Sequence, residues 1–138
     1  PIEKSVSGKE INKFITNNYP VISKSQLNDF KNPEKFEYWA VKYEELLKYK
    51  GFAKALLSTE KNHVNLDEEN AYINNSNIPY YTIWGDSDSV VVYNVFKEKF
   101  NKTMTNRQEY FISESGHLPH MENIKEFEKV LFDQILTN

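Results

Sequence analysis

Two polar turns in residues 77–122 hold the side chains best suited to chemistry, and each turn follows a short apolar run. The residues in them that we consider for acid–base chemistry are Asp86, Asp88, His117 and His120. A carboxylate that accepts a hydrogen bond from the Nδ1–H of a histidine fixes its tautomer and stabilises the imidazolium formed during proton transfer. An acid in the first turn and a histidine in the second would therefore make an acid–base pair for hydrolysis.

The elements around the two turns predict that they meet at one edge of a sheet. Residues 78–84 are apolar, β-branched or aromatic, which indicates a strand buried on both faces of a parallel sheet, with Pro79 at its entry. Residues 90–100 have helical spacing of apolar positions, and residues 109–113 form a second strand. A strand–helix–strand unit is a right-handed parallel crossover. Because neighbouring strands lie about 5 Å apart, the acid and the imidazole come within hydrogen-bonding reach.

The remaining chain is expected to be largely helical. Ser7 and Glu10 have the form of a capping box for a helix to about Asn17, stopped by Pro20. A short helix is expected over residues 24–31. A long helix should follow Pro33 to about residue 59, bent near Gly51, with a buried aromatic stripe. Residues 61–77 show no periodicity and predict a surface connection. The last helix should open at residue 123 with Asn as its cap.

Composition bounds the function classes. With 138 residues, of which 39% are hydrophobic and 27% charged, the chain has the length and composition of a single globular domain. The net charge of -3 and pI near 5.7 argue against a nucleic-acid partner. There is no cysteine, which excludes a thiolate nucleophile, and no apolar run reaches the roughly 20 residues of a transmembrane helix. The chain starts at Pro1 without methionine, so we expect the native N-terminus upstream and leave the compartment open, with the cytoplasm as default.

The two turns resemble a known family. Residues 78–91, Ile-Pro-Tyr-Tyr-Thr-Ile-Trp-Gly-Asp-Ser-Asp-Ser-Val-Val, look like the seventh strand and acid loop of the α/β-hydrolase superfamily. Residues 115–123, Ser-Gly-His-Leu-Pro-His-Met-Glu-Asn, look like its eighth-strand histidine loop, and residues 51–59 are similar to the helix that leads from the lid into the core. The resemblance covers roughly residues 33–136.

This resemblance implies an α/β fold: the C-terminal portion of an α/β-hydrolase, two parallel strands with flanking helices, preceded by helical lid segments. Residues 1–32 would be a lid remnant and residues 33–138 the C-terminal part of the core. Carried over, Asp88 matches the catalytic acid and His117 the catalytic histidine, while Asp86 falls on a variable position. The implied activity is serine-hydrolase chemistry on an ester or lipid-like small molecule, without a cofactor.

The nucleophile of this family is missing from the chain. Its serine precedes the acid on a Gly-x-Ser-x-Gly turn, and none of the four glycines here brackets a serine in that pattern. The simplest explanation is a fragment that lacks the first six strands and the oxyanion-hole loop. We therefore expect no triad-level activity from this chain alone. The exposed edge of a two-stranded sheet should bind the missing half or cause self-association.

Other interpretations stay open. Asp88 could cap the following helix, and His117 could be an ordinary loop histidine, although the strand-end positions favour the acid–base roles. Asp86 is the reserve acid, and His120 is expected to orient its loop. A metal site built from the four turn residues has suitable ligand types but no spacing that demands it. Rival functions are an epoxide hydrolase, dehalogenase or carbon–carbon bond hydrolase, or a non-catalytic interaction module.

Overall fold

The computed structural model describes residues 7–76 and 78–137, which group into two compact units. Of the expected features, residues 1–6 of the first domain and Asn77, the first residue of the acid–histidine stretch, lie outside the described residues. Unit 1 is formed by the chain up to Asn28 and by Pro33–Val64, and unit 2 by Asp29–Asn32 and the chain from Asn65 onward. The chain thus enters unit 2 for four residues and returns to unit 1. Residues 33–64 group with the N-terminal helices.

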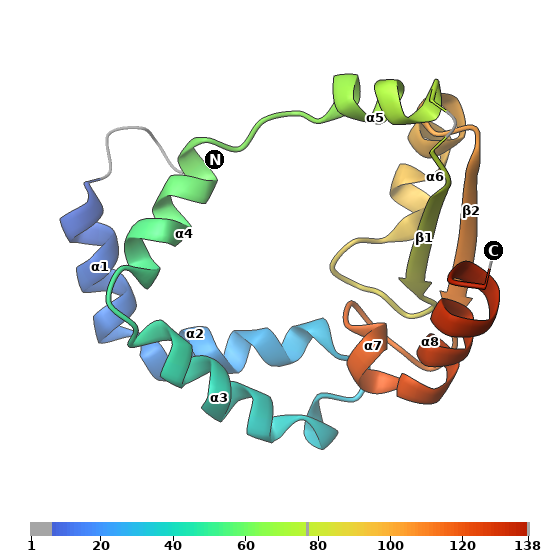
Figure 1. Ribbon diagram of the computed structural model, residues 1–138. Helices are drawn as coiled ribbons and strands as arrows, with labels where there is room; N and C mark the ends of the chain where they lie inside the picture. Colours follow the sequence, from blue (N-terminus) through green and yellow to red (C-terminus); the bar gives the residue numbers. More distant parts are fainter. Residues whose placement is uncertain (1–6, 77, 138) are drawn as a thin grey trace. The chain divides into compact units, whose positions relative to one another are not determined.

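Unit 1 is entirely helical in its described part (Figure 1). Its elements are α1 (Gly8–Asn17), α2 (Tyr19–Ser25), the 3-10 turn η1 (Gln26–Asp29, whose last residue belongs to unit 2), the 3-10 turn η2 (Pro33–Lys35), α3 (Glu37–Leu47) and α4 (Phe52–Lys61). The predicted capping box is confirmed, with Glu10 N donating to Ser7 Oγ at 3.3 Å and Ser7 N to Glu10 Oε2 at 2.9 Å.

The first helix ends at Asn17 as predicted, and Pro20 lies in the first turn of the next helix, α2, where its missing N–H has no intrahelical partner to lose. Two other helix predictions in unit 1 were wrong in their boundaries. The helix expected over residues 24–31 is instead the end of α2 followed by η1. The long helix expected from Pro33 starts as a 3-10 turn and becomes α-helical at Glu37.

The bend predicted near Gly51 is confirmed. Gly51 has a φ of 94°, a left-handed conformation that favours glycine, and it separates α3 from α4. Ile15, Leu47 and Ala53 form a buried hydrophobic cluster in unit 1. The expected aromatic stripe is only half-buried, since Phe36, Trp39 and Tyr43 keep part of their surface in solvent.

Unit 2 is built on the predicted strand–helix–strand unit (Figure 1). Its elements are α5 (Asp67–Asn74), β1 (Tyr80–Gly85), α6 (Tyr93–Thr103), β2 (Arg107–Ile112), α7 (Pro119–Glu122), α8 (Ile124–Val130) and the π-helical turn η3 (Leu131–Ile135). The strands pair in parallel, from Tyr80 opposite Arg107 to Gly85 opposite Ile112. The chain is therefore mixed α/β and mostly helical, with one small parallel sheet.

One face of the sheet packs against α6 through aromatic rings. The Trp84 ring lies 5.3 Å from Tyr93 and 5.5 Å from Phe100, and Tyr93 lies 4.9 Å from Phe111 (centroid distances). The strand expected to be buried on both faces is wrong in that respect, because Tyr80–Trp84 are half-buried and only Gly85 is buried. Two strands with few covering helices cannot enclose both faces.

The connection expected over residues 61–77 contains a helix, α5, so that prediction was wrong. Asp67, Glu68 and Glu69 fill its first turn, where acidic side chains complement the helix dipole. Asp67 N donates to Asn65 Oδ1 at 3.0 Å, and Asp67 pairs with Lys99 of α6 at 2.6 Å. Local hydrogen bonding by Asn65 and an ion pair with a neighbouring helix thus hold α5, and hydrophobic periodicity reports neither.

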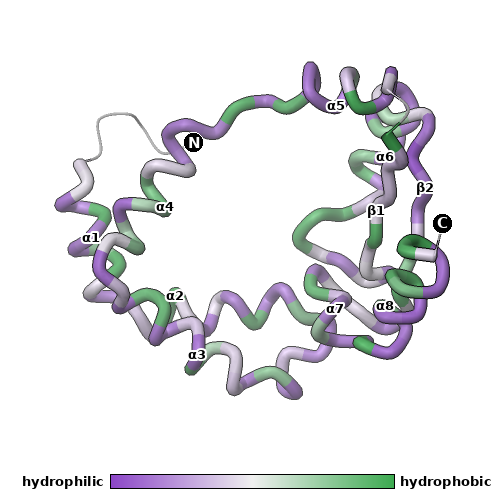
Figure 2. The backbone as a smooth tube through the Cα atoms, in the orientation of Figure 1, coloured by the Kyte–Doolittle hydropathy of each residue, from purple (hydrophilic) through white to green (hydrophobic). Residues whose placement is uncertain are grey.

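The last helix starts as predicted. The Asn123 side chain accepts a hydrogen bond from Glu126 N at 3.4 Å, and α8 follows. Hydrophobic and hydrophilic residues alternate along the helices of both units (Figure 2). Within residues 7–76 and 78–137, none of the helices has the length and apolarity to cross a membrane.

Candidate acid–histidine site

The structure brings Asp88 and His117 together. Asp88 lies in the loop after β1 and His117 in the loop after β2, and His117 Nδ1 is 2.9 Å from Asp88 Oδ2. The predicted proximity is confirmed. The Asp88 side chain is 7% exposed and the His117 side chain 36% exposed. An ionised Asp88 requires the proton on Nδ1, which leaves Nε2 as the nitrogen that can exchange a proton with a reactant.

The second oxygen of Asp88 organises its own loop. Oδ1 accepts hydrogen bonds from Val90 N at 2.8 Å and Val91 N at 2.9 Å. These bonds cap the turn that leads into α6, whose own N-cap position is Val92. Asp88 therefore closes the turn before α6 through Oδ1 and does not cap the helix itself, while Oδ2 faces the histidine.

Two glycines allow the two strand-end loops to approach closely. A Cβ on Gly85 would overlap the backbone of Gly116 and lie 2.5 Å from the carbonyl oxygen of Ser115. The Ser87 N–H donates to that carbonyl at 2.9 Å, and Asp86 N donates to the Ile112 carbonyl at 3.0 Å. Backbone contact without side chains between them holds the acid loop against the histidine loop, which we define as residues 113–118.

The histidine loop has an unusual backbone. Glu114 has a φ of 54°, a left-handed conformation that costs a non-glycine residue about 1–2 kcal/mol. Ser115 is fully buried, and its hydroxyl donates to the Ile112 carbonyl at 2.9 Å. Strained residues of this kind persist only where surrounding contacts determine them.

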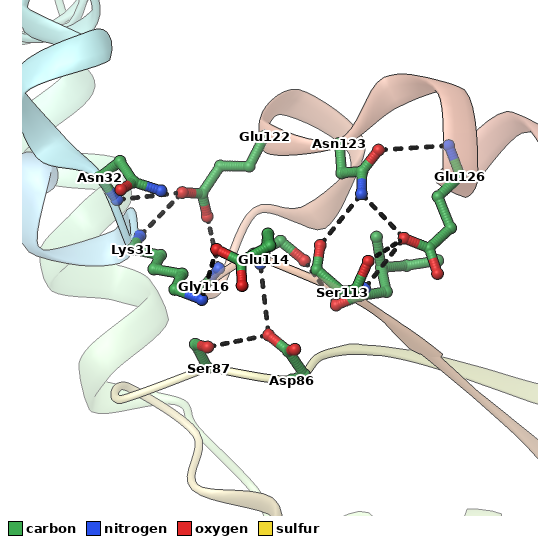
Figure 3. A network of polar contacts seen from close by, with 12 residues as sticks. Lys31, Asn32, Asp86, Ser87, Ser113, Glu114, Gly116, Glu122, Asn123 and Glu126 are labelled. Carbon is green, nitrogen blue, oxygen red and sulfur yellow. Dashed lines mark hydrogen bonds and ion pairs between the residues drawn. The ribbon is translucent and has the colours of Figure 1, made fainter.

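Asp86, the reserve acid, has partners other than a histidine. Its Oδ1 accepts from Ser87 Oγ at 2.8 Å and from Ser115 N at 3.4 Å (Figure 3). Burial raises the pKa of Asp86, but hydrogen bonds from Ser87 and from the Glu114 and Ser115 backbone, with the Lys31 charge, lower it below its ordinary value. Asp86 therefore acts as an ionised acceptor between the loops.

Residues 29–32 contribute to the site, and the sequence analysis missed them. His117 N donates to the Asp29 carbonyl at 2.8 Å. Burial raises the pKa of the Asp29 carboxyl; the charge of Asp88 acts in the same direction and that of His117 against it. No sequence signal identified this segment, because it followed a helical pattern and lies far from the histidine loop in the chain.

Glu122 also joins the site, while His120 does not. The Glu122 carboxylate accepts from Lys31 N at 2.8 Å and from the Gly116 N–H, so it lies between residues 31–32 and the histidine loop (Figure 3). His120 is exposed and its ring lies 5.9 Å from Phe127. Among the described residues, no group of three histidine or acidic side chains is arranged to hold a metal ion.

Serine hydroxyls near the pair have other partners. Ser87 Oγ donates to Asp86, Ser113 Oγ to Glu126 at 2.6 Å and Ser115 Oγ to the Ile112 carbonyl. The geometry therefore provides an oriented base without assigning any of these hydroxyls as its nucleophile.

Comparisons of the chain with protein-family models, curated proteins and solved structures found no match.

Proposed function

We propose that Asp88 and His117 are the acid and the histidine of a serine-hydrolase triad of the α/β-hydrolase type, acting on an ester or lipid-like acyl substrate. One observation carries the proposal: Asp88 Oδ2 and His117 Nδ1 lie 2.9 Å apart in the loops after two adjacent parallel strands, with the acid almost fully buried. The resemblance of residues 78–91 and 115–123 to the family's acid and histidine loops supports it.

In this proposal His117 acts as general base and then as general acid. Its Nε2 takes the proton of a serine hydroxyl as the serine oxygen attacks the ester carbonyl, and Asp88 stabilises the resulting imidazolium. The imidazolium then gives this proton to the departing alkoxide. Water repeats the sequence on the acyl-enzyme and releases the acid. No cofactor takes part, and the serine and the oxyanion donors belong to chain outside the 138 residues.

The test is hydrolysis of p-nitrophenyl acyl esters by the complete native protein and by its His117→Ala variant. Loss of the histidine of a triad lowers kcat about 10⁶-fold. His63→Ala is the matched control, because His63 is exposed in a loop of unit 1. Equal activity of His117→Ala and the native protein would refute the proposal.

A fluorophosphonate probe identifies the nucleophile. We expect a labelled serine outside residues 1–138, and no labelling in His117→Ala. A native protein that turns over substrate through an aspartate would instead be an epoxide hydrolase or dehalogenase, and one without turnover would be an interaction module. Enzymatic rates from the 138 residues alone, abolished by His117→Ala, would contradict the external nucleophile.

A further inference from the structure

A four-residue segment from a distant part of the chain braces the histidine loop. We call this segment, Asp29–Asn32, the strap. Lys31 of the strap precedes Glu122 by 91 positions in the chain, yet the two are hydrogen-bonded. The strap contacts the histidine loop directly at two points and contacts Glu122 of α7 at a third. The contacts are His117 N to the Asp29 carbonyl at 2.8 Å, the Glu122 carboxylate to the strap backbone, and Lys31 Nζ to Glu114 Oε2 at 2.8 Å.

Glu122 connects the strap to the loop through both of its carboxylate oxygens. Oε1 accepts from Lys31 N at 2.8 Å and from Asn32 N at 3.3 Å, while Oε2 accepts from Gly116 N (Figure 3). All three donors are backbone N–H groups, so the carboxylate fixes main-chain positions. Hydrogen bonds to an ionised acceptor are roughly twice as strong as neutral ones.

The strap leaves no room for displacement of the residue before the histidine. A Cβ on Gly116 would lie 2.7 Å from the Asp29 carbonyl oxygen and 2.8 Å from Lys31 N. The same Asp29 carbonyl accepts the His117 N–H. The main chain of Gly116 and His117 is therefore held between the strap and the acid loop.

We propose that Glu122 is a positioning residue: by joining the strap to Gly116 it sets the main-chain position of His117, and so keeps the imidazole at hydrogen-bonding distance from Asp88. The mechanical part of this inference stands on the contacts alone. Its catalytic consequence rests on the proposed hydrolase function.

Glu122→Gln tests the connection that the Glu122 carboxylate makes between the strap and Gly116. A glutamine has one acceptor oxygen in place of two, so it cannot accept from the strap and from Gly116 together. Glu126→Gln is the matched control, because Glu126 Oε2 also accepts three hydrogen bonds, from Ser113 N at 3.0 Å, Ser113 Oγ at 2.6 Å and Asn123 Nδ2 at 2.8 Å. Those bonds join Ser113, the first residue of the histidine loop, to the start of α8, and they involve neither the strap nor Gly116.

Hydrogen exchange of the His117 amide in the complete native protein measures positioning without turnover. We expect Glu122→Gln to accelerate this exchange about 10- to 100-fold, the equivalent of one lost charge-assisted hydrogen bond, and Glu126→Gln to leave it unchanged. With a p-nitrophenyl ester, kcat of Glu122→Gln should fall by up to about 100-fold with little change in KM, because misplacement of a catalytic group affects the chemical step.

Unchanged exchange in Glu122→Gln, or equal acceleration in Glu126→Gln, would overturn the inference. If Glu122→Gln does not fold, Glu122→Asp against Glu126→Asp decides it: the shorter carboxylate keeps its charge but cannot span both partners, so only Glu122→Asp should accelerate His117 exchange. Normal ester hydrolysis by His117→Ala would refute the proposed function instead, and the exchange data would still test the strap.

Discussion

Replacing Asp88 by asparagine separates the two tasks of this carboxylate, because its two oxygens have different partners. Oδ1 accepts from the Val90 and Val91 backbone, and Oδ2 pairs with His117 Nδ1. An asparagine that keeps its oxygen toward the backbone preserves the turn, since asparagine is as good a cap as aspartate. Its amide nitrogen then faces Nδ1 and favours the tautomer with the proton on Nε2, which cannot act as a base.

The expected magnitudes follow from these contacts. In a serine-hydrolase triad the wrong tautomer lowers kcat about 10⁴-fold, and we expect a loss of that order in Asp88→Asn. Its unfolding free energy should fall by about 1 kcal/mol, the difference between a charge-assisted and a neutral hydrogen bond. Asp88→Ala loses the turn bonds as well, which adds about 0.5–2 kcal/mol.

The assay compares kcat for a p-nitrophenyl ester with urea unfolding of the same native protein. Asp86→Asn is the matched control, because an asparagine oxygen can still accept from Ser87 Oγ and Ser115 N. We expect its kcat to remain within a few-fold of the native value. The ¹⁵N chemical shifts of His117 report the tautomer directly in Asp88→Asn.

Two results would refute this reasoning. If Asp86→Asn loses activity and Asp88→Asn retains it, the orienting acid is Asp86. If Asp88→Asn and Asp88→Ala lose the same unfolding free energy, the hydrogen bonds from Val90 and Val91 to Oδ1 do not stabilise the turn as we infer.

Three further predictions concern stability and association. Burial raises the pKa of Glu109, but the Arg107 guanidinium and the Tyr93 hydroxyl lower this pKa below its ordinary value of 4.5. The stability that ionised Glu109 contributes is therefore present above pH 4.5 and is lost as the pH falls through the lowered pKa. The loss of unfolding free energy caused by Glu109→Gln at pH 7 should shrink when urea unfolding is repeated at acid pH. An equal loss at both pH values would contradict a stabilising role of the Arg107–Glu109 ion pair. Gly85→Ala should lower the unfolding free energy by about 3 kcal/mol, because the added Cβ would overlap backbone atoms. Gly51→Ala should lower it by only about 1 kcal/mol, because its Cβ meets open space and only the φ of 94° is unfavourable. Thermal unfolding of both variants measures this order. Finally, the 138 residues expressed alone should self-associate through the unpaired edge of β1, and sedimentation of a monomer at high concentration would contradict this.

Local chemistry in the sequence determined several helix ends of this protein and the pairing of Asp88 with His117. The capping box at Ser7, the bend at Gly51 and the cap at Asn123 depend on neighbouring residues, so pattern alone predicts them. The meeting of Asp88 and His117 was also predictable, because parallel strands of a crossover place their carboxyl ends together.

Only the tertiary structure decided which distant groups complete the site. The strap Asp29–Asn32 and its bridge through Glu122 join residues about ninety positions apart, and no periodicity or motif encodes such a contact. The burial of β1 also depends on tertiary structure. An apolar composition shows that a strand can be buried on both faces, but the number of helices that cover the sheet determines how much of it is buried. The sequence thus specified Asp88 and His117 as partners, and the fold specified which main-chain contacts hold the histidine loop in place.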